Sequence, residues 1–207
     1  MTVGNELRAR LRDATAQIHQ RLHVHPGLGA AASGAMGLAD YQLLLRRLWG
    51  FHKAFEVTLE EAARGLTLDI DLSARARAPM LEADLRALGL GQDRIARLSL
   101  CEHMFRPQNM AACMGALYVI EGSTLGGIQI ARALAGLFGG EEGEGRKFFL
   151  GYGAQHGPMW RSFLARLDAC SGDEAREAAA IDGAVQTFAA FEGWMDGWRD
   201  NGLATGR

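Results

Sequence analysis

The stretch YVIEGSTLGGIQIARAL, residues 118–134, combines a helical pattern with three interior glycines. Its apolar residues recur every three or four positions, which predicts an α-helix. Each of Gly122, Gly126 and Gly127 costs about 1 kcal/mol relative to alanine inside a helix. A chain that places three glycines so close together needs either tight contact with other helices or a bare backbone surface for a ligand.

Tyr118, Gly122 and Gly126 are four residues apart, so they form one stripe on a single helix face. A packing explanation places a neighbouring helix against this stripe. A functional explanation places a flat ligand there, with the helix bent to admit it. Glycine content leaves both explanations open. A phosphate-binding loop of the Walker type is excluded, because the segment has no Gly-Lys-Ser/Thr triplet and follows no strand.

The composition is that of an ordinary globular chain: 207 residues, 48% hydrophobic and 22% charged. A net charge of -2 provides no basic surface for nucleic acid or an anionic membrane. The three cysteines show no Cys-x-x-Cys spacing, which argues against a disulfide framework or a zinc ribbon. The N-terminal segment lacks an apolar signal core, and no run of about 18 apolar residues is present. We therefore expect a reduced, cytoplasmic protein with no membrane span.

Nearly every periodic segment has a helical period. We expect helices near residues 5–23, 41–65, 74–88, 92–98, 107–140, 160–169 and 173–200, and loops at 24–37 and 141–158. No alternating strand pattern is present, and no linker separates two cores. The sequence predicts a single all-α domain over residues 1–207, in which packed helices build any site.

The first helix carries an imidazole and a guanidinium on the same side. His19 lies at the shoulder of the apolar face, and Arg12 lies two turns earlier, about 10.5 Å away along the axis. A neutral imidazole is a good iron ligand, and arginine pairs well with a carboxylate. Taken alone, His19 is more simply a half-buried helix residue without a ligand. His19 and His23 have the spacing of a metal pair, but no Glu-x-x-His is present, so we discount a ferritin-like di-metal site.

Five segments together resemble the heme oxygenase family, in particular its bacterial, biliverdin-producing branch. LRDATAQIH resembles the first-helix signature of that family, and YVIEGSTLGG is similar to its kinked distal helix. YQLLLRRLWGFHKAFE is similar to the second helix, and MWRSFLARL with QTFAAFEGWM resembles the C-terminal half. The resemblance covers most of the chain. It implies a single-domain heme-oxygenase-like helical bundle with a kinked distal helix.

The resemblance also assigns roles on the proximal side and at the edge of a heme. The histidine of the first-helix signature is the proximal heme ligand, so His19 would be the axial ligand of the iron. Arg12, Tyr118 and Arg161 match positions that hold heme propionates in the family. Arg161 could equally be a solvated arginine, and Tyr118 a core tyrosine with its hydroxyl at the edge.

On the distal side, Gly122, Gly126 and Gly127 would line the heme face. Animal members carry an Asp just after the first distal glycine, where it anchors water beside the bound oxygen. Here that position is Ser123, a feature shared with the bacterial EGSxLG form. The resemblance therefore makes Gly122, Ser123 and Gly126 the catalytic surface, with a different proton route.

The activity implied is oxidative opening of heme to biliverdin, iron and carbon monoxide. Heme b would be both cofactor and substrate, with O2 and electrons from an external reductase. The resemblance implies an electron-donor protein of the ferredoxin or flavin reductase type and allows delivery of biliverdin to a bilin photoreceptor. The sequence does not specify the meso carbon attacked or the oligomeric state.

Three other classes of protein share parts of this pattern. A non-catalytic heme carrier or sensor would need the same pocket residues. A helical enzyme acting on thiamine or quinone precursors would share the architecture without binding heme. A helical interaction module would explain the apolar pattern, but not the combination of Arg12, His19 and the glycine stripe.

Overall fold

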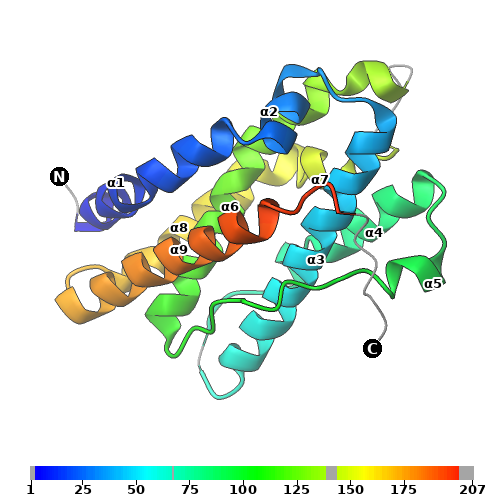
Figure 1. The fold of residues 1–207 in the computed structure, drawn as a ribbon. Helices are drawn as coiled ribbons and strands as arrows, with labels where there is room; N and C mark the ends of the chain where they lie inside the picture. The colour runs from blue at the N-terminus through cyan, green and yellow to red at the C-terminus, as the bar shows by residue number, and fades with distance from the viewer. Residues whose placement is uncertain (1–2, 67, 139–143, 201–207) are drawn as a thin grey trace.

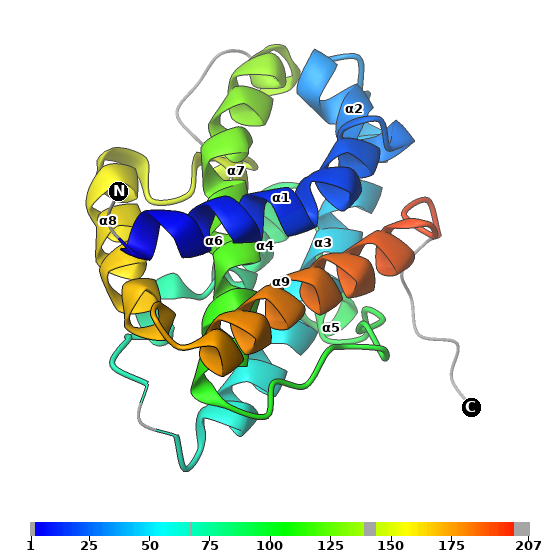
Figure 2. The ribbon, with the colours of Figure 1, turned by 90° about the vertical axis from the view of Figure 1, so that its left-hand side faces the viewer.

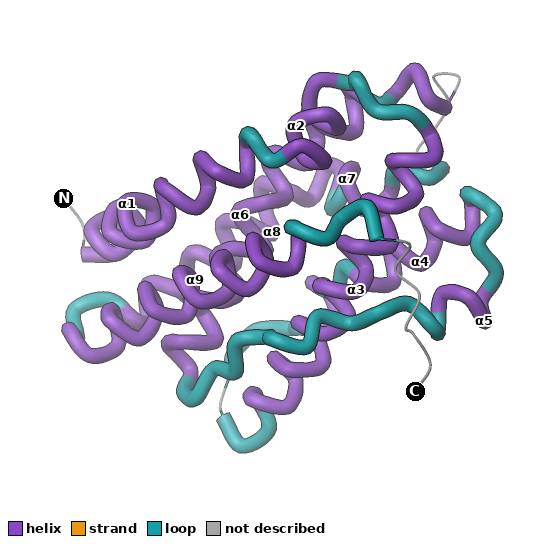
Figure 3. The backbone as a smooth tube through the Cα atoms, in the orientation of Figure 1, coloured by secondary structure: helices purple, strands orange, loops and turns teal. Residues whose placement is uncertain are grey.

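The residues described in this computed structural model, 3–66, 68–138 and 144–200, form helices and connecting segments with no strand among them (Figure 3). The predicted all-α class is confirmed. The α-helices are α1 (Val3–His23), α2 (Pro26–Ser33), α3 (Leu38–Ala63), α4 (Ala78–Ala87), α5 (Gln92–Ile95), α6 (Met110–Ala133), α7 (Lys147–Leu150), α8 (His156–Leu167) and α9 (Glu174–Met195). The 3₁₀ turns are η1 (Ser73–Arg75), η2 (Ala135–Phe138), η3 (Gly153–Gln155) and η4 (Asp168–Cys170).

The loop expected at residues 24–37 was wrong, because it contains the two-turn helix α2. Pro26 opens this helix, where its missing N–H leaves no intrahelical bond unmade. The His25 ring caps it, with Nδ1 accepting from the N–H groups of Gly27 at 3.2 Å and Leu28 at 3.3 Å. Histidine is not among the usual capping residues, so the local pattern concealed the helix.

Two other helices begin later than expected. The third expected helix begins at Ala78, because residues 73–75 form η1, and Pro79 lies in the first turn of α4. The glycine-bearing helix begins at Met110 rather than at residue 107, because Asn109 caps it. The Asn109 Oδ1 accepts a hydrogen bond from the backbone N–H of Ala112.

Two further expected segments differ from the structure within the described residues. Helix α6 ends at Ala133 and is followed by η2; the expected end at residues 139–140 lies outside the described residues. The described part of the loop expected at 141–158 contains α7, η3 and the start of α8. The described residues of α6 are helical across all three glycines, and the predicted kink stays a prediction.

Helix α6 is the element around which the others are arranged. It packs against α9, α8, α7 and α2, while α1 packs on α9 and α2. Figure 1 shows α1 and α9 running side by side, and Figure 2 shows α1 crossing in front of α6. Helices α3 and α4 contact each other and cover another side of the bundle. The first helix is therefore held near α6 mainly through α9 and α2.

The contact between α6 and α9 is made by backbone. A Cβ atom at Gly115 of α6 would overlap the carbonyl oxygen of Ala180, and one at Gly183 of α9 would overlap that of Ala112. Each helix thus offers a glycine where the other presents its backbone. These two glycines let the helices approach more closely than any side chain would permit.

Within the described residues, only α6 has the length and apolar composition of a membrane-crossing helix. Its most apolar stretch is 61% buried inside the molecule, which is what the core helix of a globular bundle shows. Its apolar character is therefore accounted for by packing in the bundle.

Candidate functional site

His19 presents an imidazole on the outer side of α1. The residue is exposed, although its ring lies edge-on to His23, with centroids 4.5 Å apart, and 6.3 Å from the ring of Phe188 on α9. Partial burial lowers the pKa of His19 below its ordinary 6.5, and the neighbouring His23 lowers it further. The imidazole is therefore neutral at pH 7, which leaves a nitrogen lone pair for a metal ion.

Gly122 and Gly126 form a strip of bare backbone on α6. A Cβ atom added at either position would meet no atom within 4 Å. The neighbouring Leu125 leaves 51% of its surface exposed, which is unusual for a leucine of a central helix. No helix packs against this strip, so the packing explanation fails for these two glycines.

Gly127 faces in another direction. It is buried, and an added Cβ would lie 2.9 Å from the carbonyl oxygen of Phe149 on α7. Its lack of a side chain is explained by this close approach. The packing explanation therefore holds for Gly127, and we leave it out of the open strip formed by Gly122 and Gly126.

Ser123 lies beside the open strip, with its hydroxyl already engaged. Its Oγ donates to the carbonyl oxygen of Ile120 at 2.7 Å, and Thr124 Oγ1 donates to that of Glu121 at 2.8 Å. Back-bonding of this kind in consecutive residues favours a bend in the helix. The Ser123 oxygen keeps its acceptor capacity toward a ligand or water, since its own proton is used within the helix.

Arg12 and Tyr118 bring α1 and α6 together at one edge of the strip. Burial raises the pKa of Tyr118, and the charge of Arg12 nearby opposes that rise. Arg12 is exposed, and its ion pair with Asp13 is long, at 3.7 Å. His19 shares the Arg12 side of α1, and Gly122 and Gly126 share the Tyr118 face of α6.

Arg161 lies on α8, the helix that carries an aromatic neighbour of Tyr118. Its neighbour Trp160 has its ring 6.0 Å from the ring of Tyr118. Arg161 itself is exposed, and the described contacts do not join it to Arg12. The structure therefore brings Arg12 to Tyr118 and places Arg161 one residue from the tyrosine's aromatic neighbour.

Helix α2 links α1 to α6. It follows α1 directly and packs on α6, where a Cβ at Gly34 would lie 2.6 Å from the carbonyl oxygen of Ala133. The His25 cap also ties α2 to α9, since its Nε2 lies 3.1 Å from the Met195 carbonyl oxygen. Helix α2 thus contacts α1, α6 and α9.

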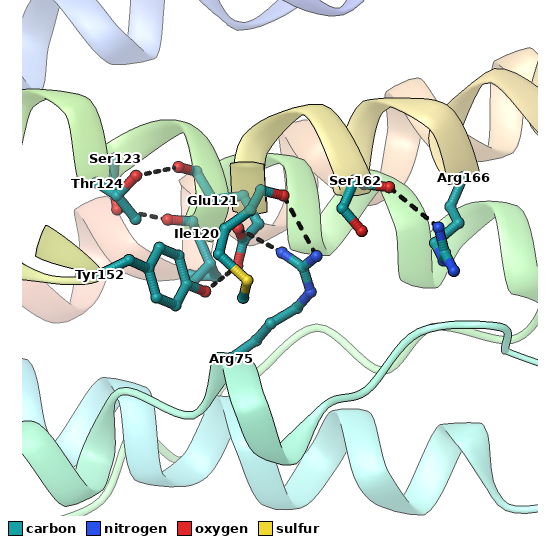
Figure 4. A network of polar contacts seen from close by, with 9 residues as sticks. Arg75, Ile120, Glu121, Ser123, Thr124, Tyr152, Ser162 and Arg166 are labelled. Atoms are coloured by element: carbon teal, nitrogen blue, oxygen red, sulfur yellow. Dashed lines mark hydrogen bonds and ion pairs between the residues drawn. The ribbon is translucent and has the colours of Figure 1, made fainter. Parts of the chain in front are cut away.

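An ion pair behind the strip holds α6 in place, and no sequence pattern predicted it. Glu121 and Arg75 of η1 pair at 2.6 Å, and the Tyr152 hydroxyl donates to the other Glu121 oxygen at 2.7 Å (Figure 4). Arg75 also donates to the Met159 carbonyl oxygen of α8 at 3.3 Å. These partners are far apart in the sequence, and no periodic pattern links them. Together they hold the Glu121 side of α6 against its neighbours, and Gly122 and Gly126 lie on the uncovered side.

The described residues contain no cluster of three or more His, Cys, Asp or Glu side chains suited to a metal ion. A metal ion held by His19 would therefore need further ligands from solvent or from a bound cofactor. The arrangement suits a flat, metal-bearing ring with acidic substituents at one edge.

The sequence matches the family described as heme oxygenase over residues 5–197. The chain belongs to the heme oxygenase family. A heme oxygenase of Xanthomonas campestris pv. campestris (strain 8004) is 34% identical over 163 residues, which span 78% of this chain and 92% of the relative. The resemblance stated from the sequence motifs is thus confirmed, and the chain is an enzyme of this family with heme as its substrate.

Solved structures show the same fold. The heme oxygenase of Leptospira interrogans has a TM-score of 0.74 at 18% identity, covering 94% of this chain and 98% of its own. The NO- and CO-bound heme oxygenase of Neisseria meningitidis has a TM-score of 0.68 at 24% identity, covering 100% of this chain and 96% of its own. The heme-oxygenase-like helical bundle predicted from the sequence is confirmed.

Proposed function

We propose that heme binds between α1 and α6, with His19 as the axial ligand of its iron and the strip of Gly122 and Gly126 against its opposite face. The observation that carries this proposal is the strip itself, because an added side chain at either glycine would point into open space. A macrocycle needs a flat surface of this kind. A neutral imidazole on the facing side of α1 supplies the metal ligand.

The edge of the site provides groups for the propionates. Arg12 is an exposed cation whose ion pair with Asp13 is long, at 3.7 Å, and Tyr118 carries a hydroxyl that can donate to a carboxylate. Arg161 on α8 extends the same edge. Binding both propionates here would orient the ring within the site, which decides the carbon that faces the oxygen.

Bound heme supplies the iron at which O2 is activated, and the reaction opens the ring to biliverdin, iron and carbon monoxide. The chain contributes position and environment. The strip offers no strong acid–base pair, so no side chain there promotes cleavage of the O–O bond away from the ring. Ser123 Oγ is held by the Ile120 carbonyl oxygen and can accept a hydrogen bond from water. Electrons would come from a ferredoxin or flavin reductase type of partner, and biliverdin could pass to a bilin photoreceptor.

Hemin titration followed by reduction in air tests this proposal. We expect the Soret band to decay and a bilin band to appear. Heme that stays intact under these conditions would support a carrier or sensor instead. The His19→Ala variant should lose the spectrum of histidine-ligated heme and most of its turnover, whereas His103→Ala, at an exposed histidine outside the site, should retain both.

The distal strip is tested by Gly126→Leu. A leucine there should obstruct heme or divert the reaction, because its side chain would occupy the space proposed for the ring. Gly136→Leu is the matched control, since a side chain at Gly136 also meets no atom within 4 Å but lies beyond α6, in η2. Normal turnover by Gly126→Leu would contradict the assignment of the strip.

A further inference from the structure

Two histidines lie one helical turn apart on the exposed side of α1. His19 and His23 both belong to its last turns, and their ring centroids are 4.5 Å apart at an interplanar angle of 82°. Paired histidines four residues apart on one helix face bind zinc in helical metal sites. The proposed heme site uses His19 alone and gives His23 no part.

The charge of the neighbouring Arg21 does not oppose a cation at this pair. Arg21, the basic residue between the two histidines, turns away to α9, where its Nε and Nη2 donate to the two carboxylate oxygens of Glu192 at 2.6 and 2.7 Å. Its charge is therefore balanced. Phe188 contacts His19 edge-on from α9 and limits the orientations of that ring. Both histidines stay open to solvent, which can complete the coordination of an ion.

We propose that His19 and His23 together bind a divalent first-row transition-metal ion in the heme-free chain. Metal–nitrogen bonds of about 2.0–2.1 Å require the two rings to direct one nitrogen each at a common point, which a change of side-chain rotamer provides. With two imidazole ligands, Cu²⁺ binds most tightly, Ni²⁺ and Zn²⁺ less so, and Fe²⁺ weakly.

The metal ion and heme exclude one another at His19. This consequence rests on the proposed function, since it requires His19 to be the axial ligand of heme. A bound metal ion would block the imidazole that heme needs, so heme-free protein loaded with metal should take up hemin more slowly. The pair would thereby make heme uptake sensitive to the supply of free copper or zinc.

Cu²⁺ titration of the heme-free full chain in a non-chelating buffer tests the site. We expect one tight Cu²⁺ equivalent, with an electron paramagnetic resonance spectrum showing two coupled nitrogens. His23→Ala should weaken binding about tenfold or more, because the second imidazole of a chelate acts at a high effective concentration. It should also leave a single coupled nitrogen. His103→Ala is the control and should change neither quantity, and circular dichroism checks that each variant is folded.

Hemin competition separates this proposal from the proposed function. One equivalent of hemin should displace Cu²⁺ from the wild-type chain, and Cu²⁺ should no longer slow hemin uptake by His23→Ala. Equal Cu²⁺ affinity in His23→Ala and the wild type would overturn the two-histidine site and leave the heme site standing. A chelate that depends on both histidines but is not displaced by hemin would support the metal site and count against His19 as the heme ligand.

Discussion

The glycines of α6 fall into two groups that have opposite surroundings. At Gly115 and Gly127, an added Cβ would meet the backbone of α9 or α7; at Gly122 and Gly126, it would meet nothing. The first pair lets other helices approach, and the second pair leaves a surface uncovered. The same residue type therefore serves packing on one side of the helix and leaves bare backbone on another.

The polar groups of α6 divide in the same way. Glu121 points to the closed side, where it pairs with Arg75 and accepts from Tyr152. Ser123 and the half-buried Tyr118 belong to the open side. The closed side fixes the position of the helix through neighbours that are far apart in the sequence. The open side contributes little to holding the helix in position, so its backbone can stay uncovered.

The largest effect should come from breaking the closed side at Glu121→Gln. The change leaves the Arg75 guanidinium without its counter-charge, and both side chains are at most 5% exposed. Removing one partner of a buried pair costs about 3–5 kcal/mol. Urea unfolding followed by circular dichroism measures the loss. The control is Glu82→Gln, which breaks the more exposed pair with Arg86 and should cost less than about 1 kcal/mol. Equal losses in the two variants would contradict the structural importance of the buried pair.

Gly115→Ala should have the next largest effect. The new methyl group would overlap the Ala180 carbonyl oxygen, so α6 and α9 would have to separate. Overpacking of this kind costs typically about 1–3 kcal/mol, and a clash with backbone belongs at the upper end. The matched change Gly122→Ala, on the open side, should cost nothing. Differential scanning calorimetry of both variants gives the comparison, and a Gly115→Ala melting temperature equal to that of the wild type would show that the two helices do not meet at this glycine.

Buried His52 and exposed His19 extend the comparison to pH. Burial, and secondarily the charge of Arg77, lower the pKa of His52 to about 3, so the folded chain keeps this ring neutral. The unfolded chain takes up a proton near pH 6.5. Stability is therefore present above pH 6.5 and is lost as the pH falls from 6.5 toward 3. Relative to pH 8, we expect a loss of about 2 kcal/mol at pH 5.

Urea midpoints at pH 8 and pH 5 measure this loss. His52→Phe keeps an aromatic ring but removes the titration, so its stability should fall less at pH 5. Comparison with this variant is needed because burial raises the pKa of Asp84 to about 6, which gives the opposite slope over part of the same range. His103→Ala, at an exposed histidine, should keep the wild-type slope. A slope unchanged in His52→Phe would mean that His52 is not the group responsible.

The sequence allowed the helices and part of the site to be predicted, because both depend on local spacing. Helical periodicity located most elements. The four-residue spacing of Tyr118, Gly122 and Gly126 placed them on one helix face, and in the structure the two glycines of that face are uncovered. Helix α2 was missed because its support is tertiary: a Cβ at Gly27 would lie 2.7 Å from the Trp198 ring, so this glycine indicates close packing rather than a loop. Gly127 lies about 100° from Gly126 around the helix, outside that stripe, and only the family resemblance placed it on the heme face.

The smallest effect, and the one of opposite sign, should come from Gly126→Ala. Replacing a glycine in a helix by alanine stabilises by roughly 0.5–1 kcal/mol when the methyl group meets no clash. Urea unfolding of the heme-free chain should therefore show a gain, whereas hemin titration should show weaker binding, because the methyl group stands in the space proposed for the ring. Gly136→Ala, which is also open but lies in η2, should leave hemin affinity unchanged. If Gly126 is retained because a ligand binds against it, the variant should gain stability and lose heme affinity. A loss of stability, or hemin binding equal to the wild type, would return Gly126 to the packing group of Gly115 and Gly127.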